Sequence, residues 1–341
     1  MAQITRALLL SCFCLWCGTI PAIALQAPTP ALPPPEPAVD VATLQAAAGR
    51  GDARAEFELA LYYGRDAATD AQSVEWLKKS AEHGFADAQH TLALLYLAGG
   101  RGVTVDAALA AEWWQKAAAQ GVAQSQYALA QLYDAGVGLT QDSAKAVEWW
   151  RKAADQGNAF AQNMLGKSYF EGKGVEQDGA VAIALWRKAA AQGHAPAMLN
   201  IGIAYSTGRG VERDDAEAVN WLRQAAEAGN LTAMNNLGAA LASGTGTPEA
   251  PAEAVSWWRK SAERGDPRGQ HLLALALFHG DGAERDVIES YKWLYISVLL
   301  TSGQNQVFYI NVRDSVGTNM TSEQLVEAQK RAREWAEAFR R

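Results

Sequence analysis

The stretch that decides the fold is LGKSYFEGKGVEQDGAVAIALWRKAAAQG, residues 165–193. Its Tyr169 and the following G-x-G tripeptide recur with a period of 36 residues. The matching positions are Tyr133/Gly136/Gly138, Tyr205/Gly208/Gly210, Leu241/Gly244/Gly246 and Leu277/Gly280/Gly282, and two earlier copies are marked by Tyr63/Trp76 and Tyr96/Trp113. Seven copies at one period indicate a stacked array of one supersecondary unit.

Each copy predicts two helices joined by a glycine turn. Ala161, Leu165 and Tyr169 are spaced at i, i+4 and i+8, which places them on one face of a first helix. After the turn, Asp178 stands where the second helix starts, and its carboxylate can accept the free amide hydrogens there. The same capping aspartates are Asp106, Asp142, Asp214 and Asp286, whereas Ala250 followed by Pro251 departs from the pattern.

Tryptophan marks the second helix of nearly every copy, and we expect this shared position to lie in the core. Its members are Trp76, Trp113, Trp149, Trp221, Trp257 and Trp293, with Leu185 in the remaining copy. Three copies carry a second tryptophan directly after the first: Trp114, Trp150 and Trp258. Because adjacent residues on a helix cannot share one face, we expect this second ring to be the more exposed one and available for contact.

Both ends of the array show capping segments, as stacked repeats require. Residues 41–47 resemble an isolated second helix, and Thr321 with Gln324 has the spacing of a capping box. A stripe at 3-4-3-4 spacing follows and is expected to seal the last repeat: Leu325, Ala328, Ala332, Trp335 and Phe339. The sequence therefore predicts an all-α, right-handed α/α superhelical solenoid of about seven repeats over residues 40–303, with capping helices over residues 304–341.

The recurring pattern L-G-x-x-Y-x-x-G-x-G-V…D…K-A-A-x-x-G resembles the Sel1-like repeat, a relative of the tetratricopeptide repeat. Residues 165–193 match it nearly throughout, and the resemblance covers about residues 40–340. It implies an α-solenoid that serves as an adaptor between other proteins and that, in bacteria, is often exported.

Residues 1–24 have the features of a secretory signal peptide. Arg6 precedes an apolar run, and Ala22-Ile23-Ala24 supplies the small residues for cleavage after Ala24. All three cysteines lie in this segment, so the cleaved chain would carry none. We therefore expect a periplasmic or secreted protein that is stabilised by packing, without disulfides.

Two alternatives for the N-terminus stay open. A retained membrane anchor would need about 20 apolar residues, and Gly18 and Pro21 interrupt a shorter run. A lipoprotein site at Cys12 would be preceded by only a short apolar run. Residues 25–39 hold six of the 11 prolines and predict an extended linker.

Composition argues against several functions. A net charge of −7 with no cluster of Lys or Arg is unlike a nucleic-acid binder, and five scattered His give no zinc-ligand spacing. We expect no metal, no cofactor and no stable membrane insertion after signal cleavage. The G-x-G turns follow no predicted strand and lack the Lys-Ser/Thr ending of a phosphate loop.

The chain is therefore expected to be a non-catalytic, monomeric scaffold that binds an unidentified protein or extended peptide. A cell-envelope hydrolase of the β-lactam or peptidoglycan type is the alternative, because some cysteine-rich members of the family have been associated with penicillin. The sequence has no Ser-x-x-Lys motif and no G-x-S-x-G motif to support it.

Helical geometry predicts where a partner binds. At about 100° per residue, the positions two before and two after the core leucine of the first helix point away from the core. In a solenoid of tetratricopeptide type they would form one strip on the concave side, with the apolar pair Leu199 and Ile203 suited to a peptide groove. The predicted contact residues are Tyr127, Gln131, Asn163, Lys167, Leu199, Ile203, Asn235 and His271.

Overall fold

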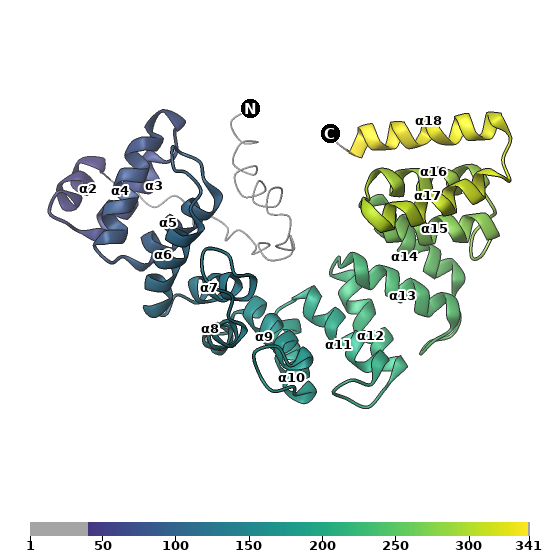
Figure 1. The fold of residues 1–341 in the computed structure, drawn as a ribbon, viewed down its shortest axis with the longest axis horizontal. Coiled ribbons are helices and arrows are strands. Elements are labelled where there is room, and N and C mark those ends of the chain that lie inside the picture. The colour runs from purple at the N-terminus through teal and green to yellow at the C-terminus, as the bar shows by residue number, and fades with distance from the viewer. Residues whose placement is uncertain (1–39, 340–341) are drawn as a thin grey trace. The chain divides into compact units, whose positions relative to one another are not determined.

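The computed structural model describes residues 40–339, and these form seventeen α-helices with no β-strand among them (Figure 1). Two compact units divide the chain after residue 177. The N-terminal unit contains α2 (Val41–Ala48), α3 (Ala53–Tyr63), α4 (Asp70–Glu82), α5 (Ala86–Ala98), α6 (Ala107–Ala119), α7 (Ala123–Ala135), α8 (Ser143–Asp155) and α9 (Ala159–Glu171). The predicted signal peptide (1–24) and linker (25–39) lie outside the described residues.

The C-terminal unit continues the same alternation of helices. It contains α10 (Gly179–Ala190), α11 (Ala195–Thr207), α12 (Asp215–Glu227), α13 (Leu231–Ser243), α14 (Pro251–Glu263), α15 (Pro267–His279), α16 (Val287–Leu299), α17 (Gly303–Gly317) and α18 (Ser322–Phe339). We call the odd-numbered helices α3 to α15 the A helices and the even-numbered helices α4 to α16 the B helices. The predicted all-α solenoid of seven two-helix repeats is confirmed.

Aspartates begin the B helices as predicted. The Asp142 carboxylate accepts the Lys145 amide at 3.0 Å, and the Asp286 carboxylate accepts the Glu289 amide at 2.9 Å. Asp106, Asp178 and Asp214 make the same capping bonds. These bonds satisfy amides that have no partner inside a helix, so capping accounts for the regular spacing of the aspartates.

The second glycine of each G-x-G turn seats the loop on the preceding B helix. Gly138 has a φ of 71° and lies against the carbonyl of Ala107, the first residue of α6. Gly282, with a φ of 75°, lies in the same way against Pro251 of α14. A Cβ atom at either position would collide with backbone, so only glycine allows both the turn and the contact.

The expectation for paired tryptophans is wrong. Trp114 and Trp150 are each only 2% exposed, and Trp258 is also buried, whereas Trp113 and Trp149 are half-buried. The B helix turns Ala110, Trp114 and Ala117 toward the core, and a residue one place earlier points about 100° away. The half-buried ring instead carries a lysine one turn later, with Lys116 Nζ 3.8 Å from the centre of the Trp113 ring.

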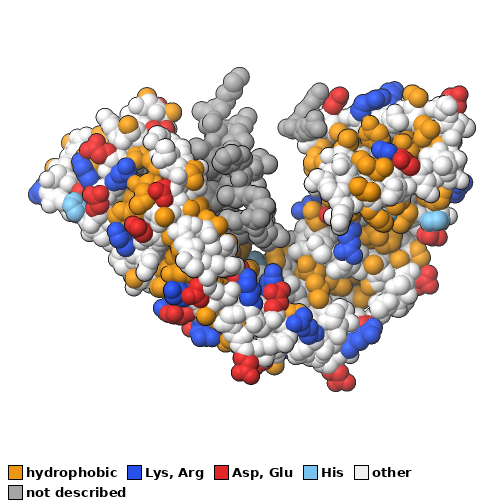
Figure 2. All heavy atoms as spheres, viewed as in Figure 1, with side chains coloured by type: hydrophobic (Ala, Val, Ile, Leu, Met, Phe, Trp, Pro, Cys, Tyr) orange, Lys and Arg blue, Asp and Glu red, His pale blue; other side chains and the backbone are white. Residues whose placement is uncertain are grey.

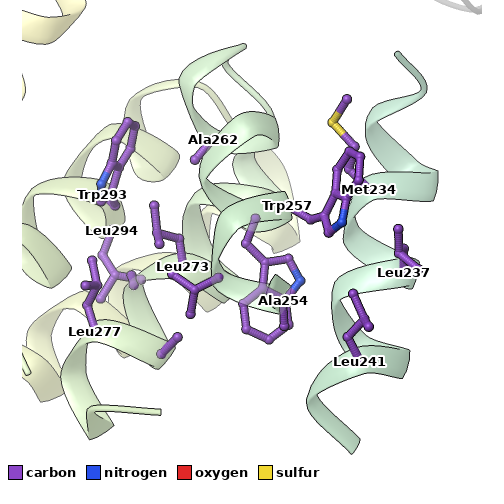
Figure 3. Packing of buried hydrophobic residues seen from close by; sticks show 14 of the residues in the cluster. Met234, Leu237, Leu241, Ala254, Trp257, Ala262, Leu273, Leu277, Trp293 and Leu294 are labelled. Atoms are coloured by element: carbon purple, nitrogen blue, oxygen red, sulfur yellow. The ribbon is translucent and has the colours of Figure 1, made fainter. Parts of the chain in front are cut away.

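At the shared position only Trp257 and Trp293 are buried, whereas Trp76, Leu185 and Trp221 are half-buried like Trp113 and Trp149, so the expectation that this position lies in the core is wrong for most repeats. Trp257 and Trp293 belong to one hydrophobic cluster whose buried members run from Val219 to Ala332. Figure 3 shows part of it, with α14 and its Trp257 between the leucines of α13 and those of α15. The buried side chains of residues 48–132, in contrast, form three smaller clusters, which are joined through the half-buried rings of Trp76, Tyr96 and Trp113.

Glutamine pairs connect successive repeats in the N-terminal unit. Gln126 Nε2 donates to the Ala118 carbonyl at 3.1 Å, and Gln156 Nε2 donates both to Gln126 Oε1 at 2.8 Å and to the Gly121 carbonyl at 2.9 Å. Gln89 and Gln120 repeat this arrangement one copy earlier. In the C-terminal unit Met198 and Met234 take the position of Gln126, whereas Gln270 keeps it and donates to the Ala262 carbonyl at 3.2 Å.

The C-terminal helix closes the C-terminal unit. The Thr321 amide donates to Gln324 Oε1 at 2.9 Å and the Gln324 amide to Thr321 Oγ1 at 3.3 Å, which is the predicted capping box. Ala328 and Ala332 are fully buried, and the Trp335 ring meets Trp293 at 5.5 Å. Within residues 40–339 no helix has the length and apolar character needed to span a membrane.

Candidate binding surface

In the N-terminal unit, the predicted contact residues of α7 form an aromatic surface. The Tyr127 ring lies 5.9 Å from Phe160 of α9, and its hydroxyl accepts a hydrogen bond from Gln131 Nε2 at 3.0 Å. Burial raises the pKa of Tyr127, so the phenol stays neutral at any physiological pH. Lys167 is exposed and pairs with Glu171 at 3.9 Å. A neutral aromatic surface with a charged edge results.

In the C-terminal unit, the apolar pair Leu199 and Ile203 is half-buried. Leu199 packs against the large hydrophobic cluster. Ile203 lines an open pocket of about 280 Å³ between α11 and α13, which we call the α11–α13 pocket. Its floor is formed by α12 through Ala218, Val219 and Leu222, and the rest of its lining is Ser206, Asp215, Asn236, Ala239, Ala240, Ser243 and Thr245.

The pocket exists because small residues occupy the places of large ones. Ser206 stands at the register position of Phe170 and Phe278, and Ala239 at that of Lys167 and Leu275. Removing a ring and a long side chain from facing helices leaves space that an external apolar side chain can fill. Figure 2 shows hydrophobic side chains gathered in patches on the visible face of each unit.

Two predicted contact residues are buried instead of pointing outward. Asn235 is 1% exposed, and its Nδ2 donates to Asp266 Oδ2 at 2.7 Å, at the start of the next A helix. Asn163 is also buried. His90, at the same position of its repeat, contacts Ser125 Oγ of the next A helix at 2.7 Å. The position two before the core leucine therefore faces the neighbouring repeat, which a single-helix projection does not include.

His271 lies near the C-terminal end of the row of A helices. Its ring is 5.2 Å from Phe308 and 5.3 Å from Tyr309, both on α17. Burial lowers the pKa of His271, so the ring is neutral near pH 7. Phe308 is half-exposed, and the three rings add an aromatic surface at this end.

Side chains that could bind a metal ion together would have to lie close to one another. In the described part of the chain, no three His, Cys, Asp or Glu side chains are grouped to hold a metal ion. The sequence analysis missed Ser206 and Ser243, because its projection followed only two positions per helix. The signal was present in the small residues Ser206 and Ala242, which stand at the register position of Phe170 and Phe278.

Known proteins share this architecture. The Sel1 repeat family model matches seven segments: 53–85, 86–122, 123–158, 159–194, 195–230, 231–266 and 267–300. The chain belongs to the Sel1 repeat family. Proteins of this family generally act as non-catalytic scaffolds for protein–protein interaction.

Solved structures agree with the family. A Sel1 repeat protein from Oxalobacter formigenes is 29% identical over 70% of this chain and 97% of its own, with a TM-score of 0.60. A protective antigen of uropathogenic Escherichia coli is 23% identical over 88% and 95%, with a TM-score of 0.49. An immunity protein from Pseudomonas aeruginosa is 28% identical over 58% and 75%, with a TM-score of 0.37. A comparison with curated proteins found no match.

Proposed function

We propose that this chain is an exported, non-catalytic scaffold that binds another protein or an extended peptide in the cell envelope, and that it acts there as a monomer. Membership of the Sel1 repeat family supports the scaffold role. The secretory features of residues 1–24 support export. Loss of residues 1–24 from protein recovered from the periplasm or medium, measured by intact mass, tests the export part.

The observation that carries the binding role is the α11–α13 pocket beside Ile203 and Ala239, two outward positions of neighbouring A helices. An apolar floor with hydroxyl and amide groups at the rim suits the side chain of a bound peptide. Tyr127, Gln131 and Lys167 offer a further contact surface in the N-terminal unit. Leu199 lies on α11, the helix that carries Ile203, and His271 lies on α15 of the same unit.

A photo-crosslinking residue at position 239 tests this proposal directly. Ala239 is exposed at the pocket rim, whereas Ser256 is exposed on the B helix α14 and serves as the matched control position. In cells, we expect position 239 to yield a discrete crosslinked product that position 256 does not. Adding Ile203→Asp should abolish the product while leaving helicity and melting unchanged; equal crosslinking at both positions would overturn the proposal.

The hydrolase alternative is tested separately with the purified protein. Turnover of nitrocefin or of muropeptides that disappears on changing a single serine would replace the scaffold proposal. No motif in the sequence selects that serine.

A further inference from the structure

A second pocket, distinct from the A-helix surface, lies where the last repeat meets the C-terminal helix. It is open and has a volume of about 640 Å³. It lies between Arg259 of α14, the loop and start of α16 with Ala283, Arg285, Asp286 and Glu289, and Gln324 of α18. This volume is within the range of small-molecule sites, roughly 300–1,000 Å³.

The arginine of this pocket has lost the partner that its equivalents have. In two earlier repeats, the arginine at the equivalent position donates a hydrogen bond to the tyrosine hydroxyl of the next A helix. Arg151 Nη2 donates to Tyr169 Oη at 3.0 Å, and Arg187 Nη2 donates to Tyr205 Oη at 2.7 Å. The residue in the corresponding place for Arg259 is Leu277, which has no hydroxyl. The usual phenol bond is therefore absent.

A glutamate replaces the tyrosine as the arginine's partner in repeat six, but the equivalent glutamate in repeat seven is already paired with other side chains. Arg223, which faces Leu241 in the same register, pairs with Glu253 instead. The equivalent carboxylate near Arg259 is Glu289, but Lys292 holds it at 2.7 Å and Arg331 of α18 approaches it at 3.9 Å. Among residues 40–339, Arg259 consequently makes no hydrogen bond or ion pair.

The walls of the pocket offer both signs of charge. A half-buried, unpaired guanidinium binds a carboxylate through two parallel hydrogen bonds. Arg285 is partly committed, because its Nε donates to the Phe278 carbonyl at 2.9 Å. Glu284 has no partner in the described chain, and Asp286 uses Oδ1 for its helix cap. Three carboxylates among the lining residues disfavour a dianion and favour a ligand that also carries a positive charge.

The geometry points to a binding site for a zwitterionic ligand, an α-amino acid or a short peptide, whose carboxylate pairs with Arg259 and whose ammonium group lies toward Glu284 and Asp286. Space for it comes from Ala283, which replaces the larger Leu139, Val175, Val211 and Thr247 of the other repeats. The site does not depend on the A-helix surface proposed above, so either proposal can fail alone.

Calorimetry with triglycine and with free glycine tests the site and distinguishes a peptide ligand from a free amino acid. We expect binding of one or both, and at least tenfold weaker binding of triglycine amide, which lacks the carboxylate, and of N-acetyl-triglycine, which lacks the ammonium. Binding by glycine alone would assign the site to free amino acids, and binding by triglycine alone would assign it to peptide ends. Binding of neither probe, or of succinate as tightly as triglycine, would overturn the proposal.

Three variants connect binding to the pocket without an expected loss of folding. Arg259→Gln should weaken binding at least tenfold, whereas Arg187→Gln, which removes the same group at the equivalent position of repeat four, should leave it unchanged. Leu277→Tyr restores the tyrosine of the earlier repeats and should also weaken binding by engaging Arg259. Unchanged binding in Arg259→Gln would overturn the proposal.

Discussion

The two units of this chain use one repeat but hold successive copies together differently. In the N-terminal unit, the buried side chains of residues 48–132 form small clusters that only half-buried rings join, and the pair Gln126–Gln156 donates hydrogen bonds to the backbone of the preceding repeat. In the C-terminal unit, the buried side chains from Val219 to Ala332 merge into one cluster. The comparison predicts two levels of cooperativity from one sequence period, because local packing decides how far a disturbance spreads.

The largest effect is expected from removing a buried tryptophan in each unit. Trp114→Ala and Trp258→Ala should each destabilise by about 3–5 kcal/mol. Hydrogen exchange should show accelerated exchange through residues 219–332 for Trp258→Ala. For Trp114→Ala it should be confined to the neighbourhood of residues 93–132. An equal spread in the two variants would break the comparison.

A smaller effect is expected from converting a glutamine pair to the residues of the C-terminal unit. Gln126→Met removes one hydrogen bond from the Ala118 carbonyl and one from the Gln156 amide, each of which keeps a bond to Gly121, a loss of about 1–2 kcal/mol. The double variant Gln126→Met with Gln156→Ala reproduces Met198 and Ala228 of repeat five. Chemical denaturation should show that the double variant costs less than the sum of the singles, since they share one bond. Strict additivity would mean that the pair does not act as a unit.

The smallest effect concerns the cap of α11. His194 begins this helix without a capping side-chain bond, whereas Asn158 and Asn230 cap the A helices of neighbouring repeats at 2.9 Å. Burial lowers the pKa of His194 to about 4, below its unfolded value of about 6.5. The unfolded chain therefore takes up the proton first. The stability that His194 contributes is complete above about pH 6.5 and is lost as the pH falls toward 4.

His194→Asn should stabilise the C-terminal unit by about 1 kcal/mol at pH 7 and reduce its sensitivity to acid. Melting measured from pH 7.5 to pH 4.5 checks both expectations. Part of the acid sensitivity should remain, because burial also lowers the pKa of His271 in the same unit. Identical pH profiles for the variant and the parent would contradict the assignment.

Much of the fold was predictable, because its determinants are local and repeated seven times. The A and B helices, the capping aspartates and the Thr321–Gln324 box all follow from spacing along the chain. The burial of Trp114 and Trp150 was not predictable from a shared aromatic position alone. A half-buried tryptophan that stacks on a lysine recurs in the repeats as regularly as a buried one, so recurrence does not tell the two apart.

The candidate surfaces were less predictable, because they depend on contacts between repeats. Projection of one helix placed Asn235 outward, but the next repeat covers it and bonds to it. The α11–α13 pocket and the site at Arg259 arise from small departures from the repeat, Ser206 for phenylalanine and Leu277 for tyrosine. Such departures are visible in the sequence, but their effect depends on which neighbouring side chains are already engaged.

The contact between each glycine turn and the preceding B helix affects how the number of repeats can change by recombination. Gly138 and Gly282 each touch a residue 31 positions earlier, so every contact joins one repeat to the previous one at a constant offset. A duplication or deletion of one full period adds or removes one glycine turn together with one helix start that such a turn contacts. At the glycine turn, the junction that recombination creates then has the same backbone contact as the junctions on either side. Unequal crossing-over can therefore lengthen or shorten the array without disturbing this contact.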